Sequence, residues 1–460
     1  MGSPRAATRR PPEKKRPTTT LQRLFELDSI TNSTQTTSAT ASETETEELL
    51  SLITHCTHSI FTFTDPSECP SHQDLKRHKL SQILSTVRLR KNHEPNVISA
   101  LVKMVSANLF RPLPAPLASN PCSVAMSDPS LDDDATAPAA VPVPAWPHLY
   151  FVYDILTSLI MNCDAKVLRA HVDRAFLSGV LTLFQSEDPR ERERLKNVYH
   201  QLYSRFTPDR SFMRKAMNDV FFRYVFETER HVGVEELLEI WGSIINGFTV
   251  PLKEEHKLFL TRVLVPLHKP KGMHAYHRQL AYCVCQFVTK EPALAGVVVR
   301  GILKYWPVTN CQKEVLIIGE LEELVEVLQP EQFGELALLI CSQIARCLNS
   351  WNSQVAERAL YVWNNERFVK MAAQSMEEVL PVVVEGIEDN MRCHWSKSVR
   401  QLTENVKRML EEMEPAMYGK CLEELRRREQ ESMQEELKRR DKWERLLKMA
   451  TASQLACVSH

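Results

Sequence analysis

Helix-sized segments with an apolar stripe recur along most of the chain. From Trp146 to about Met413, apolar residues return at the three- and four-residue spacing of an amphipathic helix. Short runs with Pro, Asn, Asp or Gly separate the segments, which predict helices over 147–163, 166–184, 190–206, 210–229, 234–246, 253–267, 275–288, 292–305, 311–327, 332–349, 353–366, 376–386 and 395–412. The stripes are too wide for a lone helix to bury, and similar pairs return every ~40–45 residues. The pattern predicts an all-α fold, a HEAT-like helical-repeat solenoid.

Several residues mark where the predicted helices begin. Pro251, Pro292 and Pro330 stand at expected first turns, where a backbone nitrogen needs no partner. Thr309 and Gln312 have the spacing of a capping box before the segment EVLIIGELEELVEVL. We therefore expect helix starts at all four places.

The chain divides into segments of different composition. Residues 1–47 are rich in Thr, Ser and Pro, with a basic start and an acidic end, and are expected to be a disordered tail. The repeat solenoid is expected over 48–416, with a long mobile loop at 112–146 where Pro, Ala, Ser and Asp predominate. Residues 417–460 predict a charged C-terminal helix and tail. Its apolar positions do not sustain a heptad pattern, so we expect a solvated helix, with docking to a partner as the alternative.

Composition narrows the possible functions. The 12 Gly against 26 Pro argue against barrels, sandwiches and nucleotide-binding loops. A formal charge of −1 gives no basic excess for nucleic acid. The sequence has no apolar run of ~18 residues and no signal peptide, so we expect a cytoplasmic protein without membrane insertion. The basic cluster at residues 9–16 leaves import into the nucleus open.

Neither a metal site nor an enzyme is predicted. The twelve cysteines include no CxxC pair, and reduced thiols are expected. One cluster has enough ligand types for zinc: His55, Cys56, His58, Cys69 and His72. His55 and Cys56 are adjacent on one predicted helix and point in different directions, so core thiols and surface histidines are the preferred interpretation. No P-loop, GxSxG, HExxH or kinase motif occurs, and we expect no catalysis and no cofactor.

Seven segments, in order, resemble a known family. They are SANLFRPLP (106–114), SEDPRERERLKNVYHQLYSRF (186–206), ELLEIWGSIINGF (236–248), PLKEEHKLFL (251–260), QLAYCVCQF (279–287), LKYWP (303–307) and QVAERALYVWNNE (354–366). Over about residues 75–415 the chain is similar to the B-prime regulatory subunits of protein phosphatase 2A. The resemblance implies a non-catalytic pseudo-HEAT subunit that docks on the scaffold and catalytic subunits and brings substrate proteins to them. A helical-repeat adaptor that joins no phosphatase is the alternative.

The resemblance also assigns a role to the SEDPRER loop. It implies that Glu187, Asp188 and Glu191 face the catalytic subunit. The residues alone predict only a helix start, since Asp188 precedes Pro189 and acids are favoured near the positive end of a helix dipole.

Four residues suggest a peptide-binding groove. Ile240 and Ile244 are one helical turn apart, and Lys253 and His256 share a face of the next predicted helix, so an apolar floor is expected beside a cationic edge. The alternative is that the isoleucines are core and the charged residues a solvated face. The stacking of repeats brings His200, Tyr203 and Arg210 toward the same groove. The resemblance implies that these positions bind short motifs of the class Leu-x-x-Ile-x-Glu.

Gln201 departs from the family pattern. The family has an arginine directly after the histidine that corresponds to His200, whereas this chain reads YHQLY. The loss of a charge-assisted hydrogen bond to an acidic or phosphorylated peptide corresponds to about 1.5–3 kcal/mol. We therefore expect ligand choice at Gln201 to differ from that of the family.

Overall fold

The computed structural model describes residues 44–61, 69–90, 93–113 and 143–458, with side chains described as far as residue 450. The described residues form helices joined by short turns, and none of them is in a strand. Two compact units are distinguished: residues up to Val180 with Ser204–Phe206, and Leu181–Tyr203 with Thr207–His460. Among the described helices none is both long and apolar enough to cross a membrane.

The first unit is a small group of antiparallel helices. It contains a helix over 44–58, followed by α2 (Pro70–Leu89), α3 (Pro95–Leu109), α4 (Trp146–Asn162), α5 (Ala165–Arg169) and α6 (Arg174–Thr182). Helix α4 packs against both α2 and α3, and its apolar side chains are buried along most of its length. Arg205 donates hydrogen bonds to the backbone carbonyls of Ile160, Met161 and Cys163, so its guanidinium caps the C-terminal end of α4.

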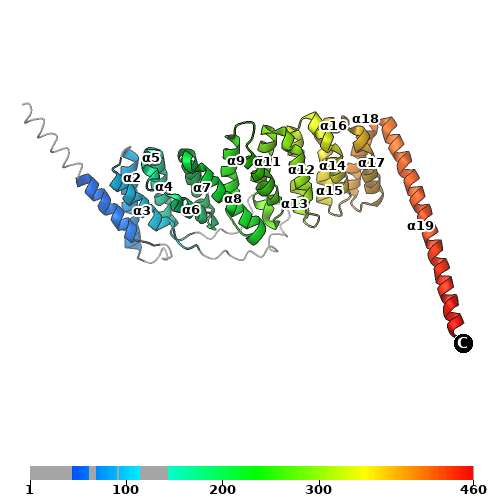
Figure 1. The fold of residues 1–460 in the computed structure, drawn as a ribbon, viewed down its shortest axis with the longest axis horizontal. Helices are drawn as coiled ribbons and strands as arrows, with labels where there is room; N and C mark the ends of the chain where they lie inside the picture. The colour runs from blue at the N-terminus through cyan, green and yellow to red at the C-terminus, as the bar shows by residue number, and fades with distance from the viewer. Residues whose placement is uncertain (1–43, 62–68, 91–92, 114–142, 459–460) are drawn as a thin grey trace, which may run out of the picture. The chain divides into compact units, whose positions relative to one another are not determined.

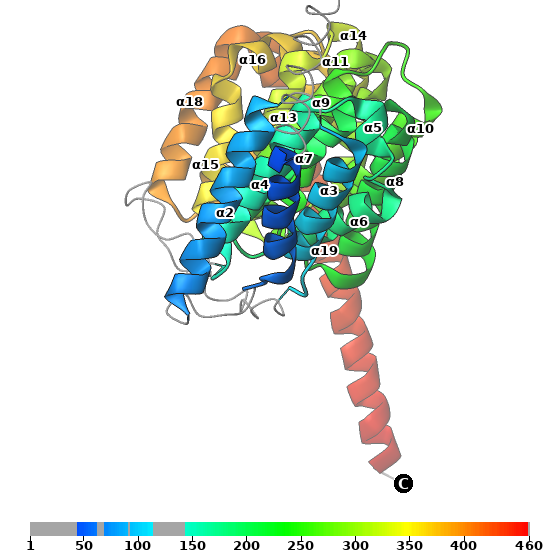
Figure 2. The same cartoon turned by 90° about the vertical axis from the view of Figure 1, so that its left-hand side faces the viewer.

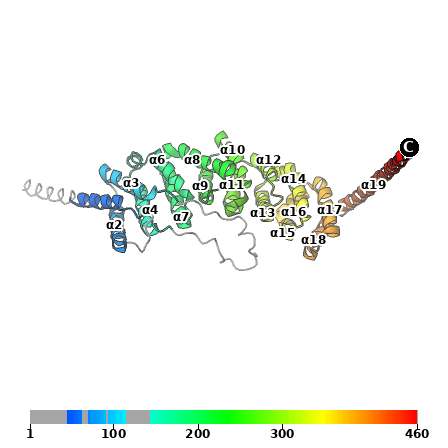
Figure 3. The ribbon, with the colours of Figure 1, turned by 90° about the horizontal axis from the view of Figure 1, so that it is seen from below.

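The second unit is a two-layer stack of helices (Figure 1). Its helices are α7 (Pro189–Arg205), α8 (Arg210–Arg223), α9 (Val234–Asn246), α10 (Glu254–Phe259), α11 (His277–Lys290), α12 (Ala295–Lys304), α13 (Cys311–Val327), α14 (Pro330–Leu348), α15 (Ser353–Tyr361), α16 (Glu366–Ala373), α17 (Met376–Cys393), α18 (Lys397–Met413) and α19 (Pro415–Val458). Helices α9, α11, α13, α15 and α18 pack consecutively in one layer, and α12, α14 and α17 in the other (Figure 3). This arrangement is the all-α helical-repeat fold that the periodicity predicts.

Apolar spacing explains why these helices stack. In α9 the buried residues include Val234, Leu237, Leu238, Trp241 and Ile245, which lie three or four positions apart and so share one face. That face is covered by α11. Because a lone helix would leave this stripe in water, each helix needs its neighbours in the stack.

Helix α19 leaves the stack. Near its start, Tyr418 is buried and bonds Glu388, and Arg428 pairs with Glu385 of α17. From residue 431 to residue 450 every side chain is exposed, and Figure 2 shows this part standing clear of α18. The distal part is therefore solvated in the isolated chain.

Some expected boundaries are wrong. The helix predicted over 166–184 is interrupted between α5 and α6. Asn310, not Thr309, caps α13, its side chain accepting the N–H of Lys313. Helix α10 begins at Glu254, three residues after Pro251, whereas Pro292 and Pro330 do stand at first turns.

Expectations for the irregular segments lie mostly outside the described residues. Residues 1–43 are among these, and residues 44–47, the last of the expected tail, are already helical. Of the loop at 112–146, only 112–113 and 143–146 are described, and Trp146 already belongs to α4.

Candidate functional site

The SEDPRER loop turns two of its acids inward at the start of α7. Asp188 accepts hydrogen bonds from the backbone N–H and the guanidinium of Arg190, at 2.7–3.0 Å. Ser186 Oγ donates to Glu191 Oε2, and both carboxylates are buried. In the chain alone, Asp188 and Glu191 close the start of α7 from within, and their contact with a partner stays a prediction. Glu187, which is half-buried, is the accessible acid of the three.

The two isoleucines of the expected groove floor are buried in α9. Ile240 is 1% exposed and Ile244 is 6% exposed. Gly242 lies between them, where an added Cβ would stand 3.0 Å from the ring of Tyr282 on α11. This burial is what the core alternative predicts, and the part of the isoleucines in peptide binding stays a prediction.

Five polar residues from three helices form a connected surface, which we call the polar edge: Tyr203 of α7, Arg210 and Arg214 of α8, and Glu255 and His256 of α10. Arg210 Nε donates to the backbone carbonyl of Tyr203 at 2.9 Å, and its guanidinium lies 5.3 Å from the centre of the Tyr203 ring. Arg214 donates to the Tyr203 hydroxyl at 3.0 Å and to Glu255 Oε1 at 3.2 Å. The structure thereby connects Tyr203, Arg210 and His256, three of the residues expected to line one groove.

His256 is a neutral part of the polar edge. Its ring stacks on Phe248 with centroids 3.6 Å apart and lies 3.4 Å from Glu255 Oε1. Burial lowers the pKa of His256, although Glu255 opposes that shift. At neutral pH its imidazole is therefore uncharged and acts as a hydrogen-bonding group.

Lys253 supplies the exposed charge beside His256. It occupies the N-cap position of α10 in an extended conformation, and its side chain is exposed. Its ammonium acts on His256 together with Arg214. The expected cationic edge therefore consists of Lys253 and Arg214, not of Lys253 and His256.

His200 and Gln201 differ in their surroundings. His200 is exposed on α7, three residues before Tyr203, so both lie on one side of that helix. Gln201 is half-buried, and its Oε1 is buried without a hydrogen-bond partner. A buried acceptor without a partner lowers the free energy of unfolding by about 1–3 kcal/mol. Among the described residues, no hydrogen bond of Oε1 holds the Gln201 side chain in place.

Sequence reasoning missed Arg214 and Glu255. Arg214 follows Arg210 by one helical turn on α8, and Glu255 directly precedes His256. The first spacing was a usable signal, because residues four apart share a helix face. The contact between Arg214 and Glu255 joins residues 41 positions apart, and no local pattern indicates it.

A second polar cluster lies inside the stack and is structural. His268, His277, Lys313 and Glu320 form this buried ion cluster. His268 donates to Glu320 at 3.0 Å and His277 donates to it at 2.9 Å, while Lys313 Nζ donates to the carbonyls of residues 268, 269 and 270. Burial alone would lower the pKa of His268, but the Glu320 carboxylate raises it. The cluster is closed to solvent and offers no site for a ligand.

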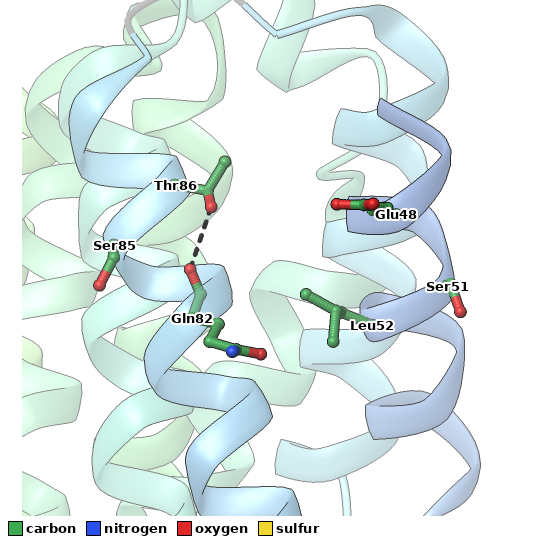
Figure 4. Close-up of a pocket in the computed structure, with 6 residues that line it drawn as sticks. All are labelled: Glu48, Ser51, Leu52, Gln82, Ser85 and Thr86. Atoms are coloured by element: carbon green, nitrogen blue, oxygen red, sulfur yellow. Dashed lines mark hydrogen bonds between the residues drawn. The ribbon is translucent and has the colours of Figure 1, made fainter. Parts of the chain in front are cut away.

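The first unit has a shallow open pocket between the 44–58 helix and α2 (Figure 4). It is lined by Glu48, Ser51, Leu52, Gln82, Ser85 and Thr86. Thr86 Oγ1 donates to the Gln82 carbonyl and Ser85 Oγ to the Ser81 carbonyl. Both of these hydroxyls therefore bond their own helix.

Metal binding finds no support among the residues that the structure describes. No three His, Cys, Asp or Glu side chains there are grouped as metal ligands would be. Cys56 is fully buried, and burial raises the pKa of its thiol to about 11. A neutral thiol is a poor zinc ligand, since zinc binds the thiolate.

Comparison with known proteins identifies similar chains. The family described as "Protein phosphatase 2A regulatory B subunit (B56 family)" matches residues 35–450. The B' alpha isoform of the 57 kDa regulatory subunit of serine/threonine protein phosphatase 2A from Arabidopsis thaliana is 44% identical, over 84% of this chain and 77% of that protein. The B' kappa isoform from Oryza sativa subsp. japonica is 41% identical, over 84% of this chain and 75% of that protein.

Proposed function

Because the chain belongs to the B56 family of protein phosphatase 2A regulatory subunits, a non-catalytic class, we propose that it recruits substrate proteins through short acidic motifs to a scaffold and a catalytic subunit. The observation that carries this proposal is the polar edge together with Lys253: Arg214 and the exposed Lys253 provide positive charge beside a hydrogen-bonding histidine. Such donors suit a peptide carboxylate.

The motif class, Leu-x-x-Ile-x-Glu, is the one that the resemblance to the family implies. Ile240 and Ile244 are in α9, the helix before α10, and in this proposal they receive the aliphatic residues of the peptide. In this proposal Tyr203, Arg210, Lys253 and His256 contact the acidic end, while His200 and Gln201 contact the region of the leucine. Because both isoleucines are buried, the aliphatic residues of the peptide reach them only when the side chains that cover them move.

We assign the contact with the catalytic subunit to the SEDPRER loop. Asp188 and Glu191 hold the loop at the start of α7, and Glu187 is the accessible acid there. In this arrangement the buried acids fix the loop, and Glu187 provides the charge that a partner meets.

The isolated chain should not dephosphorylate a phosphopeptide, and it should form a ternary complex with a phosphatase 2A scaffold and catalytic subunit. Size-exclusion chromatography of the mixed proteins measures assembly, and phosphate release measures activity. Separate elution of the chain from the other two subunits would favour an adaptor that joins no phosphatase.

Reversing the charge of Lys253, the residue next to Glu254 before the polar edge in α10, should weaken peptide binding. Lys253→Glu is expected to lower the affinity for a Leu-x-x-Ile-x-Glu peptide at least about tenfold, as a charge-assisted contact implies. Calorimetry gives the dissociation constant, and circular dichroism should be unchanged because Lys253 is exposed. Lys271→Glu, a charge reversal at another exposed lysine, is the control. Equal affinities of wild type and Lys253→Glu would remove Lys253 from the site.

A further inference from the structure

We propose that Glu255 is an internal competitor for the acidic residue of the peptide, an inference that rests on the function proposed above. In the chain without peptide, the Glu255 carboxylate occupies the donors that a ligand carboxylate would use. A ligand acid must therefore displace Glu255 before it contacts them.

The contacts of Glu255 carry the first step. Its Oε1 atom lies 3.2 Å from an amino nitrogen of Arg214 and 3.4 Å from Nε2 of His256. A single carboxylate oxygen thus meets both groups, as the oxygen of a bound acidic peptide would. Glu255 is contributed by the same helix as His256, so it is always present beside these donors.

The donors are held in place, whereas Glu255 is free to leave. The other end of the Arg214 guanidinium donates to the Tyr203 hydroxyl at 3.0 Å, and the His256 ring is stacked on Phe248. The Glu255 side chain is 53% exposed, so rotation places its carboxylate in water at little cost. Displacement therefore leaves the donors oriented for the ligand.

This exchange sets the selectivity of the site. An acidic peptide forms contacts with Arg214 and His256, but the contacts of Glu255 with the same two residues are broken. The net gain in binding free energy is therefore small. A peptide with glutamine in place of the acid leaves Glu255 where it is. Glu255 thus reduces the affinity for acidic motifs and leaves the affinity for neutral ones unchanged, which keeps binding weak and reversible.

Removing the competitor tests the proposal. Glu255→Gln should tighten binding of a Leu-x-x-Ile-x-Glu peptide roughly three- to fivefold, the ratio expected of a partly exposed ion pair. The matching Leu-x-x-Ile-x-Gln peptide should change less than about twofold. The gain for the acidic peptide should shrink as salt is raised. Calorimetry with the full chain measures both peptides.

Glu254→Gln is the matched control. Glu254 is the adjacent residue, is 85% exposed and lies 3.6 Å from Lys257, so its substitution removes the same charge without freeing Arg214. It should leave the affinity for the acidic peptide within about twofold. Equal gains in both variants, or equal gains for both peptides, would mean that net charge acts and not displacement. Absence of peptide binding in wild type and variants alike would overturn the proposed function itself, and this inference with it.

Discussion

Replacing Glu320 with glutamine is expected to lower the free energy of unfolding by about 3–5 kcal/mol, because it removes one partner from a buried ionic pair. Glu320 and His268 are both fully inaccessible to solvent. The two ring nitrogens of His268 face oxygen acceptors, the Val265 carbonyl at 2.9 Å and the Glu320 carboxylate at 3.0 Å, an arrangement that favours the imidazolium form. Without the carboxylate, that charge is buried and unpaired.

The effect should depend on pH in a defined direction. Burial opposes the ionisation of Glu320, but the histidines hold its pKa below the usual value, so its contribution is present above about pH 4.5 and is lost as pH falls through the folded pKa. The pKa of His268 is raised, so its contribution is present below about pH 6.5 and is lost as pH rises through the folded pKa. The difference between wild type and Glu320→Gln should therefore be largest between about pH 4.5 and 6.5 and decrease toward alkaline pH.

Urea unfolding across this pH range measures the difference, with Glu323→Gln as the control. Glu323 lies on the same helix, α13, and is exposed, so the same chemical change there should alter stability by less than about 0.5 kcal/mol. Equal stability of wild type and Glu320→Gln at pH 6 would show that the buried ion cluster does not hold α13 to the residues around His268.

Gln201→Arg is expected to tighten binding of a Leu-x-x-Ile-x-Glu peptide by up to about tenfold, and up to about a hundredfold when the peptide is phosphorylated beside the leucine. Arginine offers a permanent charge and several donors to a phosphate, whereas glutamine offers an uncharged amide. Among the residues that the structure describes, the Gln201 amide oxygen has no hydrogen-bond partner, so its replacement breaks no hydrogen bond of that atom there. The wild-type chain should accordingly gain little from phosphorylation of the peptide.

Calorimetry of both peptides with both proteins measures this, and the gain should shrink as salt is raised. Gln279→Arg is an unsuitable control because Gln279 bonds Glu235, whereas Gln374→Arg changes an exposed glutamine of the second unit. That control should leave both affinities unchanged. Four equal affinities for wild type and Gln201→Arg would show that position 201 does not face the peptide.

Helix existence and type could be predicted wherever the local pattern is strong. The segments 234–246 and 311–327 were expected as helices, and α9 and α13 have these bounds. In both, the apolar period is uninterrupted, and the start is marked by Gly233 in α9 and by Asn310 in α13. Between Arg169 and Arg174 the apolar pattern continues and predicts a single helix, but the chain forms two helices there, α5 and α6. Asp173 begins α6 by accepting the backbone N–H of Phe176, a local signal that the apolar period does not show.

The candidate site was predicted less completely than the helices. Tyr203, Arg210 and His256 do belong to one polar edge, but residue type alone did not separate exposed groups from buried ones. Asp188 and Glu191 looked like surface acids and prove to be internal hydrogen-bond acceptors. Burial depends on which neighbouring segments cover a side chain, and those segments are distant in sequence.

By itself, the sequence determined the all-α class, the repeat and the family, because each depends on residues close together or on motifs read in order. Tertiary structure alone decided that Glu320 accepts hydrogen bonds from His268 and His277, which are 52 and 43 positions away. It also decided that Glu255 accepts a hydrogen bond from Arg214. The physical reason is that helical periodicity records which face of a helix is apolar but not which side chains oppose it. Those pairings appear only when consecutive helices stack and remove particular polar groups from water.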